Sequence, residues 1–426
     1  MASAASTPPA ELNTISCDEL PAGTLTVEQA QQRILEPLQA VSGTERLNLR
    51  EAIGRILATD ITAAIDVPPH RNSSMDGYAF THPVAEEQLL TALTICGISF
   101  AGKPYQGMVK HGECVRIMTG AVVPQGCDTV IMQENCQREG DLITINSLPQ
   151  AGDNVRHPGD DMQRGDLVLT AGRKLNAADL GLLASLGIGE VDVIRRPRVA
   201  FFSTGDELKA IGEPLTAGDI YDSNRYTLHG MLQQLDVEII DIGVVRDTAN
   251  DVEQAFISAS QRADVLITSG GVSVGDADFV TATLEKLGEV NFWKMAMKPG
   301  KPLAHGKLDQ CLFFGLPGNP VSVMATFLLF ARPAILKLRG ENVTALPEYS
   351  ATCTETLRKA PGRKEYQRGI GYQDAQGQWQ VSSTGKQESH MLRSMSQANC
   401  FIVLERETGN LPAGSKVKII PFDGLL

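Results

Sequence analysis

The feature that most constrains the fold is a short apolar run that ends in a glycine-rich turn, residues 264–278 (DVLITSGGVSVGDAD). Its first part, 265–269, is apolar and β-branched, which is typical of a strand buried on both faces. The turn that follows contains Gly270, Gly271, Ser273 and Gly275, and a helical pattern then ends at Gly288. Backbone amides freed in such a turn can hold an anion, and Asp276 and Asp278 would stand beside it as ligands for a divalent cation. Taken alone, the loop is equally compatible with a plain tight connection between a strand and a helix.

The same construction recurs twice nearby. The apolar segment 198–203 leads into Thr204–Glu207 (TGDE), and the segment 311–315 leads into 316–320 (LPGNP), where Asn319 suits a helix N-cap and Pro320 the first helical position. Loops that follow parallel strands open at one edge of the sheet, so the three loops should converge on one crevice. Residues 294–302 (KMAMKPGKP) add three lysines, whose ammonium groups attract oxyanions. The four polar loops together favour a phosphate or oxyanion site over a solvated basic turn, which an isolated KPGKP would suggest.

Length and composition limit the classes of protein. The chain has 426 residues, 42% of them hydrophobic, and should form several domains with their own cores. A net charge of -12 argues against nucleic acid or a membrane surface as a general partner, and we find no apolar run long enough to span a membrane. Eight cysteines without a CxxC pair or a secretory signal indicate reduced thiols in a cytoplasmic protein. Seven histidines without an HxH or HxxxH pair argue against a histidine-bound metal.

Local patterns predict a multidomain α/β plus β protein. We expect amphipathic helices at 26–40, with Thr26 and Gln29 as a capping box, at 51–60 and at 176–186. Strands alternate with helices over 197–339, which favours a doubly wound, mostly parallel sheet, whereas 93–150 and the chain after 340 alternate short strands with turns. The expected parts are a flexible leader (1–23), a small helical/β linking domain (24–62 with 166–192), a β-rich inserted domain (63–165), a central α/β domain (193–345) and a C-terminal β-barrel (346–426).

Six motifs together resemble one family. They are MDGYA from Met75, RIMTGA from Arg116, STGDEL from Ser203, SGGVSVG from Ser269, KPGKP from Lys298 and LPGNPVS from Leu316. In this order they are similar to the molybdopterin molybdenumtransferase (MoeA) family, which includes the C-terminal region of gephyrin, and the resemblance runs from about residue 26 to 422. It implies a metal-dependent transferase of molybdenum cofactor biosynthesis that inserts molybdate into adenylated molybdopterin and releases AMP. It also implies Mg²⁺, a cytoplasmic homodimer of elongated four-domain subunits with a shared active-site cleft, and molybdopterin adenylyltransferase and molybdoenzyme maturation proteins as partners.

The resemblance also implies roles for individual residues. The catalytic candidates are Asp76, Thr119, Asp161, Glu207, Asp247, Lys294 and Lys298. The cofactor-binding candidates are Ser269, Gly270, Gly271, Ser273, Gly275, Lys301, Pro317, Gly318, Asn319, Pro320, Arg363, Arg368 and Ser394, and the metal candidates are Asp247, Asp276 and Asp278. Asp76, Thr119 and Asp161 belong to the N-terminal half and would reach the cleft only if that half, from the same or the partner subunit, folds over it. The chain departs from the family pattern at His157-Pro158, where basic residues are more usual, and it matches loosely over 391–398.

Two alternative functions fit part of the pattern. A molybdopterin adenylyltransferase has a fold that resembles residues 197–339, but the additional β-rich regions and the KPGKP loop argue against it. A non-catalytic pterin-binding scaffold is suggested by the second role of gephyrin, but no receptor-binding linker is visible in the sequence.

Overall fold

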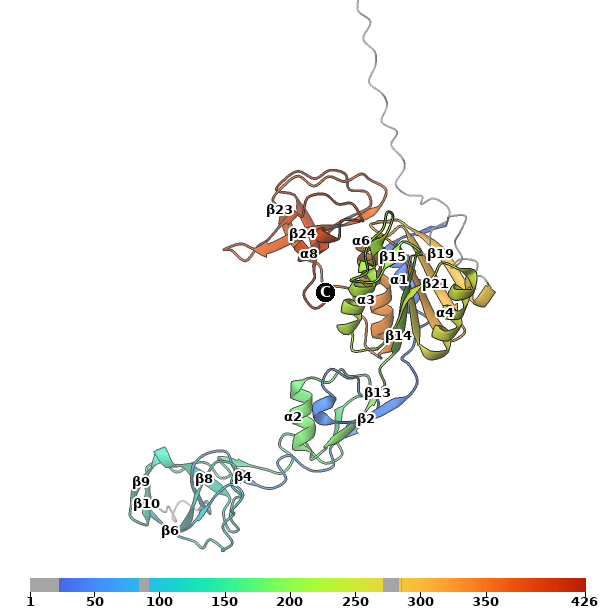
Figure 1. Cartoon of the computed structure of the whole chain (residues 1–426). Coiled ribbons are helices and arrows are strands. Elements are labelled where there is room, and N and C mark those ends of the chain that lie inside the picture. Colours follow the sequence, from blue (N-terminus) through green and yellow to red (C-terminus); the bar gives the residue numbers. More distant parts are fainter. Residues whose placement is uncertain (1–22, 84–91, 271–282, 285) are drawn as a thin grey trace, which may run out of the picture. The chain divides into compact units, whose positions relative to one another are not determined.

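The computed structural model describes residues 23–83, 92–270, 283–284 and 286–426. These residues form two compact units, which we describe separately (Figure 1). One unit is Thr44–Val193, and the other consists of the chain on either side of it.

A six-stranded sheet forms the β-rich part of the unit Thr44–Val193. Its strand order is β8-β5-β7-β6-β10-β9, and only β6 and β7 pair in parallel. The strands are β5 (Gly77–Phe80), β6 (Ala92–Ser99), β7 (Glu113–Ile117), β8 (Thr129–Met132), β9 (Cys136–Glu139) and β10 (Leu142–Ile145). Successive residues of β7 enter different apolar clusters, Cys114 on one face and Val115 on the other, which is the period-2 pattern on which the β prediction rested.

The remainder of this unit combines a helix with short strand pairs. Helix α2 (Ala177–Ser185) begins at Asn176, whose side chain caps it, and ends before Gly187, as predicted. The strand pairs are β2 (Thr44–Asn48) with β13 (Glu190–Ile194), β3 (Ile61–Thr62) with β12 (Leu167–Leu169), and β4 (Asn72–Ser73) with β11 (Val155–Arg156). The predicted helix 51–60 is wrong. A single 3-10 turn, η1 (Leu49–Glu51), is followed by Gly54 at φ +74°, after which Ile56 and Leu57 form bridges to residues 174 and 193.

The central sheet of the other unit is mixed but mostly parallel where the glycine loops emerge. Its order is β1-β19-β21-β22-β18-β14-β17, and the last four strands run parallel to one another. The strands are β1 (Thr24–Leu25), β14 (Arg198–Thr204), β17 (Glu238–Val245), β18 (Val265–Ser269), β19 (Glu289–Met295), β21 (Pro302–Leu308) and β22 (Cys311–Leu316). A short parallel pair, β15 (Leu208–Lys209) with β16 (Ile220–Tyr221), follows β14.

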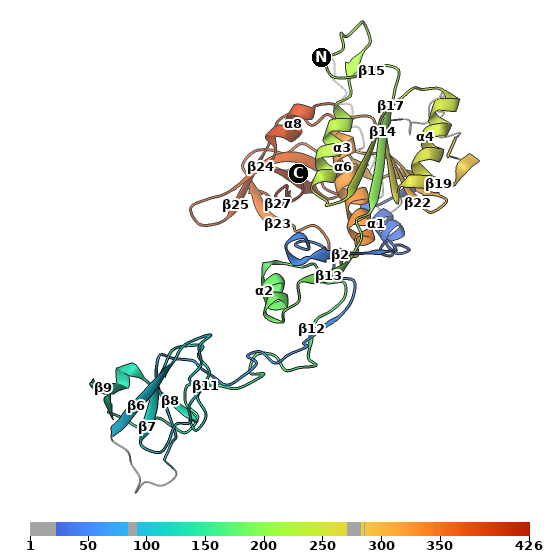
Figure 2. The same cartoon turned by 60° about the horizontal axis from the view of Figure 1, so that its bottom comes forward.

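Helices cover both faces of this sheet, so the predicted doubly wound fold is confirmed. Helices α1 (Val27–Leu35), α3 (Ser223–Gln233) and α6 (Pro320–Thr326), which continues through the π-type turn η4 (Phe327–Ala331) into α7 (Arg332–Leu338), pack on one face. Helix α4 (Ala249–Arg262) packs on the other (Figure 2). Strand β14 serves both cores, because Phe201 enters the first cluster and Phe202 the second. The predicted capping box of α1 at Thr26 is present.

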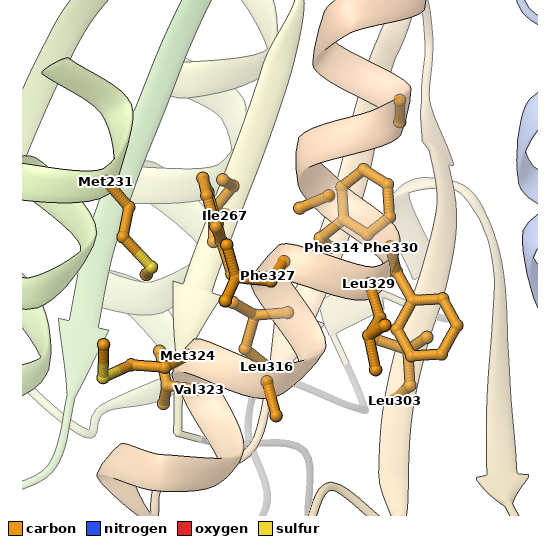
Figure 3. Packing of buried hydrophobic residues seen from close by; sticks show 14 of the residues in the cluster. Met231, Ile267, Leu303, Phe314, Leu316, Val323, Met324, Phe327, Leu329 and Phe330 are labelled. Carbon is orange, nitrogen blue, oxygen red and sulfur yellow. The ribbon is translucent and has the colours of Figure 1, made fainter. Parts of the chain in front are cut away.

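The continuous helix Pro320–Leu338 corrects one expectation from the sequence. It has 19 residues and is long and apolar enough to cross a membrane by length and composition, although we expected no such run. Within the fold, 78% of its apolar window is buried. Figure 3 shows its side chains, among them Phe327 and Phe330, packed with Ile267 and Phe314 of the sheet. The helix is therefore the core helix of the α/β domain.

A five-stranded barrel closes the C-terminal part, as predicted. Its cyclic order is β24-β25-β23-β27-β26, and β26 pairs again with β24. The elements are β23 (Tyr349–Cys353), β24 (Lys364–Gln373), β25 (Trp379–Ser383), β26 (Cys400–Leu404), β27 (Lys416–Pro421) and the short helix α8 (Leu392–Gln397). Strand β20 (Met297–Lys298) pairs with the start of β24, so the KPGKP segment joins the α/β domain to the barrel.

Candidate active site

The register of the sheet brings the ends of the three strands together, as predicted. Ser269 at the end of β18 lies opposite Ser203 of β14 and Leu316 of β22. The Gly270 amide donates to the Leu316 carbonyl at 3.2 Å, which ties the glycine turn to the start of the LPGNP loop. Gly270 and Gly318 come so close that a Cβ on Gly318 would lie 4.0 Å from the Gly270 Cα. The carboxyl edge of the sheet therefore brings two of the predicted loops into direct backbone contact.

A pocket of about 490 Å³ opens beside these loops. It is lined by Gly270, Met297, Lys298, Pro299, Gly300, Lys301, Pro302, Pro317, Gly318, Asn319, Ser322, Arg363, Gln387 and Ser389. Three of the lining side chains are cationic, and the lining drawn from the described residues includes no carboxylate. Hydroxyl and amide groups at Ser322, Gln387 and Ser389 add neutral donors. The pocket is suited to a small oxyanion.

A buried carboxylate faces the first of the pocket lysines. The Lys298 ammonium lies 3.8 Å from Glu365 Oε1, and the lysine side chain is 43% exposed whereas that of the glutamate is 6% exposed. Gln367 donates to the other carboxylate oxygen of Glu365 at 2.9 Å, which fixes the acid from behind. At 3.8 Å the pair is loose, so the Lys298 ammonium keeps donors for a ligand while its direction is set by Glu365.

The lysine loop depends on a glycine at its centre. Gly300 has φ +104°, a left-handed conformation that side chains rarely adopt. A Cβ at this position would lie 2.6 Å from Thr326 Cγ2 in helix α6. The loop between Lys298 and Lys301 can therefore pack against the helix only because residue 300 lacks a side chain.

The LPGNP loop begins helix α6 as predicted, with Asn319 at the N-cap position and Pro320 as the first helical residue. Asn319 nevertheless makes no side-chain capping bond within the described structure. The Val321 amide instead donates to the Ser389 carbonyl at 3.1 Å, and the Gly318 carbonyl accepts a bond of 2.7 Å from Asn224 Nδ2. The loop is held from outside by α3 and by the barrel segment around Ser389.

Arg368 and Ser394, two predicted cofactor-binding residues, are buried and do not line the pocket. Arg368 is 1% exposed and donates to Ser394 Oγ at 2.9 Å and to the carbonyls of residues 387 and 388 at 3.2 and 3.1 Å. Its own backbone N–H donates to Gln387 Oε1 at 2.8 Å. Burial lowers the pKa of the Arg368 guanidinium to about 10. Arg368 thus secures the segment that presents Gln387 and Ser389 to the pocket.

Gln387 and Ser389 are lining residues that the sequence analysis missed. The signal available was a polar stretch, 384–390 (TGKQESH), between two predicted strands. Without the fold, such a stretch cannot be told from an ordinary surface loop.

Carboxylates gather at the ends of β14 and β17. The Asp247 amide donates to Asp206 Oδ1 at 3.4 Å, and burial, followed by the charges of Asp206 and Glu207, raises the pKa of the Asp247 carboxyl. No group of three or more His, Cys, Asp or Glu residues in the described structure is arranged to hold a metal ion. The predicted residues Gly271, Ser273, Gly275, Asp276 and Asp278 lie outside the described residues.

Lys294, the remaining predicted lysine, lies on β19. It pairs in register with Thr24 on one side and Pro302 on the other, and its side chain is exposed. It does not belong to the pocket lining, whereas Lys298 and Lys301 do.

Asp76, Thr119 and Asp161 belong to the unit Thr44–Val193. Asp76 Oδ1 accepts bonds from the Thr119 amide at 2.7 Å and the Thr119 hydroxyl at 2.8 Å. These bonds, with a smaller contribution from the charge of Arg116, lower the pKa of the Asp76 carboxyl. Asp161 is exposed, and its backbone N–H donates to the Val67 carbonyl at 3.0 Å. Asp76 and Thr119 thus form one ionised, exposed pair.

Comparisons with known proteins cover nearly the whole chain. Residues 25–187 match the MoeA N-terminal region (domain I and II), residues 200–337 a probable molybdopterin binding domain, and residues 350–422 the MoeA C-terminal region (domain IV). A molybdopterin molybdenumtransferase of Haemophilus influenzae is 49% identical over 404 residues, which cover 94% of this chain and 100% of the relative. Gephyrin of Dictyostelium discoideum is 33% identical over 446 residues, covering 92% of this chain and 62% of the relative. The crystal structure of a molybdopterin biosynthesis MoeA protein from Pyrococcus horikoshii has a TM-score of 0.79 and 29% identity, and the match covers 94% of this chain and 99% of that one.

Proposed function

The chain belongs to the molybdopterin molybdenumtransferase (MoeA) family, and we propose that it inserts molybdate into adenylated molybdopterin. In this reaction the bond between the molybdopterin phosphate and AMP is hydrolysed, AMP leaves, and the two dithiolene sulfurs bind molybdenum. The product is the molybdenum cofactor. Full-length similarity to transferases does not favour the adenylyltransferase or scaffold alternatives.

The observation that carries the proposal is the cationic pocket at the carboxyl edge of the sheet. Molybdate is a tetrahedral dianion, and Lys298, Lys301 and Arg363 offer it charge of the opposite sign. The hydroxyls of Ser322 and Ser389 and the amide of Gln387 can donate to its oxygens. Lys294, four residues before Lys298, remains a candidate for contact with the larger pterin substrate.

We assign the adenylated phosphate groups to the glycine turn that begins at Ser269 and Gly270 and continues through Gly271, Ser273 and Gly275. A Mg²⁺ ion would neutralise part of the diphosphate charge there. Asp247 suits such an ion, because a cation would stabilise its ionised carboxyl against the burial and the like charges that raise its pKa. Glu207 adds a further carboxylate beside it. The other proposed ligands are Asp276 and Asp278.

We further propose that the active enzyme is a cytoplasmic homodimer. The Asp76–Thr119 pair and Asp161 are polar groups of the unit Thr44–Val193, and the partner subunit would bring them to the cleft. Light scattering at micromolar concentration should give twice the mass of the chain, and a monomer mass would contradict the proposal. The seven cysteines in the described part of the chain are all free thiols, which suits a reducing compartment. An enzyme that supplies adenylated molybdopterin and proteins that receive the cofactor are the expected partners.

The domain boundaries predicted from the sequence are part of the same proposal, with one correction. Strand β1 and helix α1 join the sheet and core of the α/β domain, so the linking domain begins at Thr44 and not at residue 24. Limited proteolysis should cut near residues 62, 165, 192 and 345, where the proposed domains meet. Cleavage confined to other positions would require new boundaries.

The direct test is incubation of the purified protein with adenylated molybdopterin, molybdate and Mg²⁺. We expect AMP to be released and molybdenum to appear in the pterin. Lys298→Ala should need more molybdate, whereas Lys307→Ala, which removes an exposed lysine outside the pocket, is the matched control. Failure of the wild-type protein to release AMP would refute the proposed reaction.

A further inference from the structure

Asn224, near the start of helix α3, bridges the two loops that meet at the sheet edge. Its Nδ2 donates to Ser269 Oγ at 2.9 Å and to the Gly318 carbonyl at 2.7 Å. Ser269 precedes the glycine turn, and Gly318 is the central glycine of the LPGNP loop. One carboxamide thus joins three elements that are distant in the sequence.

The bridge lies beside the oxyanion pocket without lining it. Gly318, whose carbonyl accepts one of the two bonds from Asn224, does line the pocket, and so does Gly270, which follows the other acceptor, Ser269, in the chain. The opposite side of the LPGNP loop is held by the bond from the Val321 amide to the Ser389 carbonyl. Asn224 therefore fixes one side of a loop whose other side is fixed by the barrel.

The side-chain chemistry of asparagine suits this position. The two N–H groups of the carboxamide reach two oxygen acceptors at once, which neither an alanine nor an ionised aspartate could do. The carboxamide oxygen, Asn224 Oδ1, is buried and has no partner among the described residues. The Asn224 side chain therefore holds the two loops together only through the N–H groups that it donates.

We propose that Asn224 is a positioning residue that holds Gly318 and Asn319 against the glycine turn and thereby sets the affinity of the pocket for a tetrahedral oxyanion. The affinity part of this inference rests on the proposed function of the pocket. The positioning part rests only on the two hydrogen bonds.

The test uses the full-length protein with Asn224→Ala and Asn224→Asp. His229→Ala, an exposed change on the same helix, is the matched control. Isothermal titration with molybdate alone should give binding about tenfold weaker for Asn224→Ala, because the loss of positioning hydrogen bonds of ordinary strength is of that order. Asn224→Asp should be at least as weak, since a carboxylate would face the Gly318 carbonyl. His229→Ala should bind as the wild type does.

Hydrogen exchange supplies a readout that does not depend on the ligand. Amides over 317–322 should exchange faster in Asn224→Ala than in wild type or His229→Ala, while those of β14 and β18 should be unchanged. Unchanged exchange over 317–322, or an equal rise across the whole α/β domain, would overturn the inference. Unchanged molybdate affinity in a variant with a loosened loop would overturn its affinity part. If the wild-type protein bound no molybdate, the proposed function would fail, and the exchange result would still decide whether Asn224 positions the loop.

Discussion

Replacement of Arg368 by alanine should show whether this residue holds the lining of the pocket in place or contacts the ligand itself. The guanidinium is the donor for Ser394 Oγ and for the carbonyls of residues 387 and 388, and the side chain is 1% exposed. Its neighbour in the same motif, Arg363, lines the pocket and is exposed. Arg363→Ala is therefore the natural comparison, because it removes the same charge from the ligand side.

The size of the effect on stability follows from these contacts. The guanidinium has a fourth acceptor in the Lys386 carbonyl, at 3.4 Å. Each buried acceptor left without a donor costs about 1–3 kcal/mol, so four of them give an upper limit of about 12 kcal/mol. Two considerations lower this value. Residues 386 and 388 are exposed, so water can reach their part of the loop, and burial of the guanidinium is itself unfavourable, as its lowered pKa shows. We expect Arg368→Ala to lose about 3 kcal/mol of unfolding free energy and Arg363→Ala less than about 0.5 kcal/mol.

Denaturant unfolding and molybdate dependence, measured on both variants, decide between the two roles. Arg368→Ala should unfold at lower denaturant and also require more molybdate, because Gln387 and Ser389 are no longer held in place. Arg363→Ala should require more molybdate at unchanged stability. Wild-type stability in Arg368→Ala, combined with lost molybdate binding, would show that Arg368 contacts the ligand directly and that our reasoning is wrong.

Three further predictions concern other parts of the same unit. Burial lowers the pKa of His305 to about 4, so between pH 6.5 and 4 this residue binds a proton in the unfolded chain but not in the folded chain. The free energy of unfolding should therefore fall by about 3 kcal/mol as the pH is lowered across this window. His305→Gln should make this fall smaller in a pH series of denaturant unfolding. In AMP-release assays, Lys298→Ala should raise the molybdate concentration required by about tenfold, and Asp247→Asn should raise the Mg²⁺ concentration required by about tenfold, if each removes one charged contact. If both variants showed the same defect and excess Mg²⁺ cured it, the assignment of Lys298 to molybdate and Asp247 to Mg²⁺ would be wrong. Pro320→Ala should leave pterin-adenylate binding intact and weaken insertion at low molybdate, whereas a lowered melting temperature without molybdate dependence would mean that the PGNP sequence is only a tight turn.

The sheet edge could be predicted because its signals are local. Apolar β-branched runs identify buried strands, glycine and proline mark the loops, and the alternation of strands with helices forces the loops to one edge. The same reasoning fails at 51–60, where an apolar pattern of helical period is interrupted by Gly54 at φ +74° and Ile56 and Leu57 form isolated bridges to residues 174 and 193 instead. Helical period alone does not form a helix where a left-handed glycine interrupts the run and the next residues bond to distant segments.

The distinction between Arg363 and Arg368 could not be made from sequence. Both belong to PGRKEYQRG, and both carry the charge that an oxyanion attracts. Arg363 precedes β24 and stays at the pocket, whereas Arg368 lies within the strand and is buried beneath the 386–388 segment. Which of the two arginines contacts the ligand depends on the closure of the barrel and on pairing between distant strands, and the residues of the motif indicate neither.

Three lining segments of the pocket are each held by a residue that does not line it. Lys298 is directed by Glu365, Gly318 by Asn224, and the segment around Gln387 by Arg368. The lining residues are common types, lysine, glycine, serine and glutamine, that could bind many anions if they were free to move. Selectivity for one tetrahedral oxyanion then requires fixed distances between them, since a flexible cationic loop adapts equally well to sulfate, phosphate or molybdate. The three supporting residues should therefore govern discrimination among anions more than total charge does, because each fixes geometry while leaving the lining cations in place.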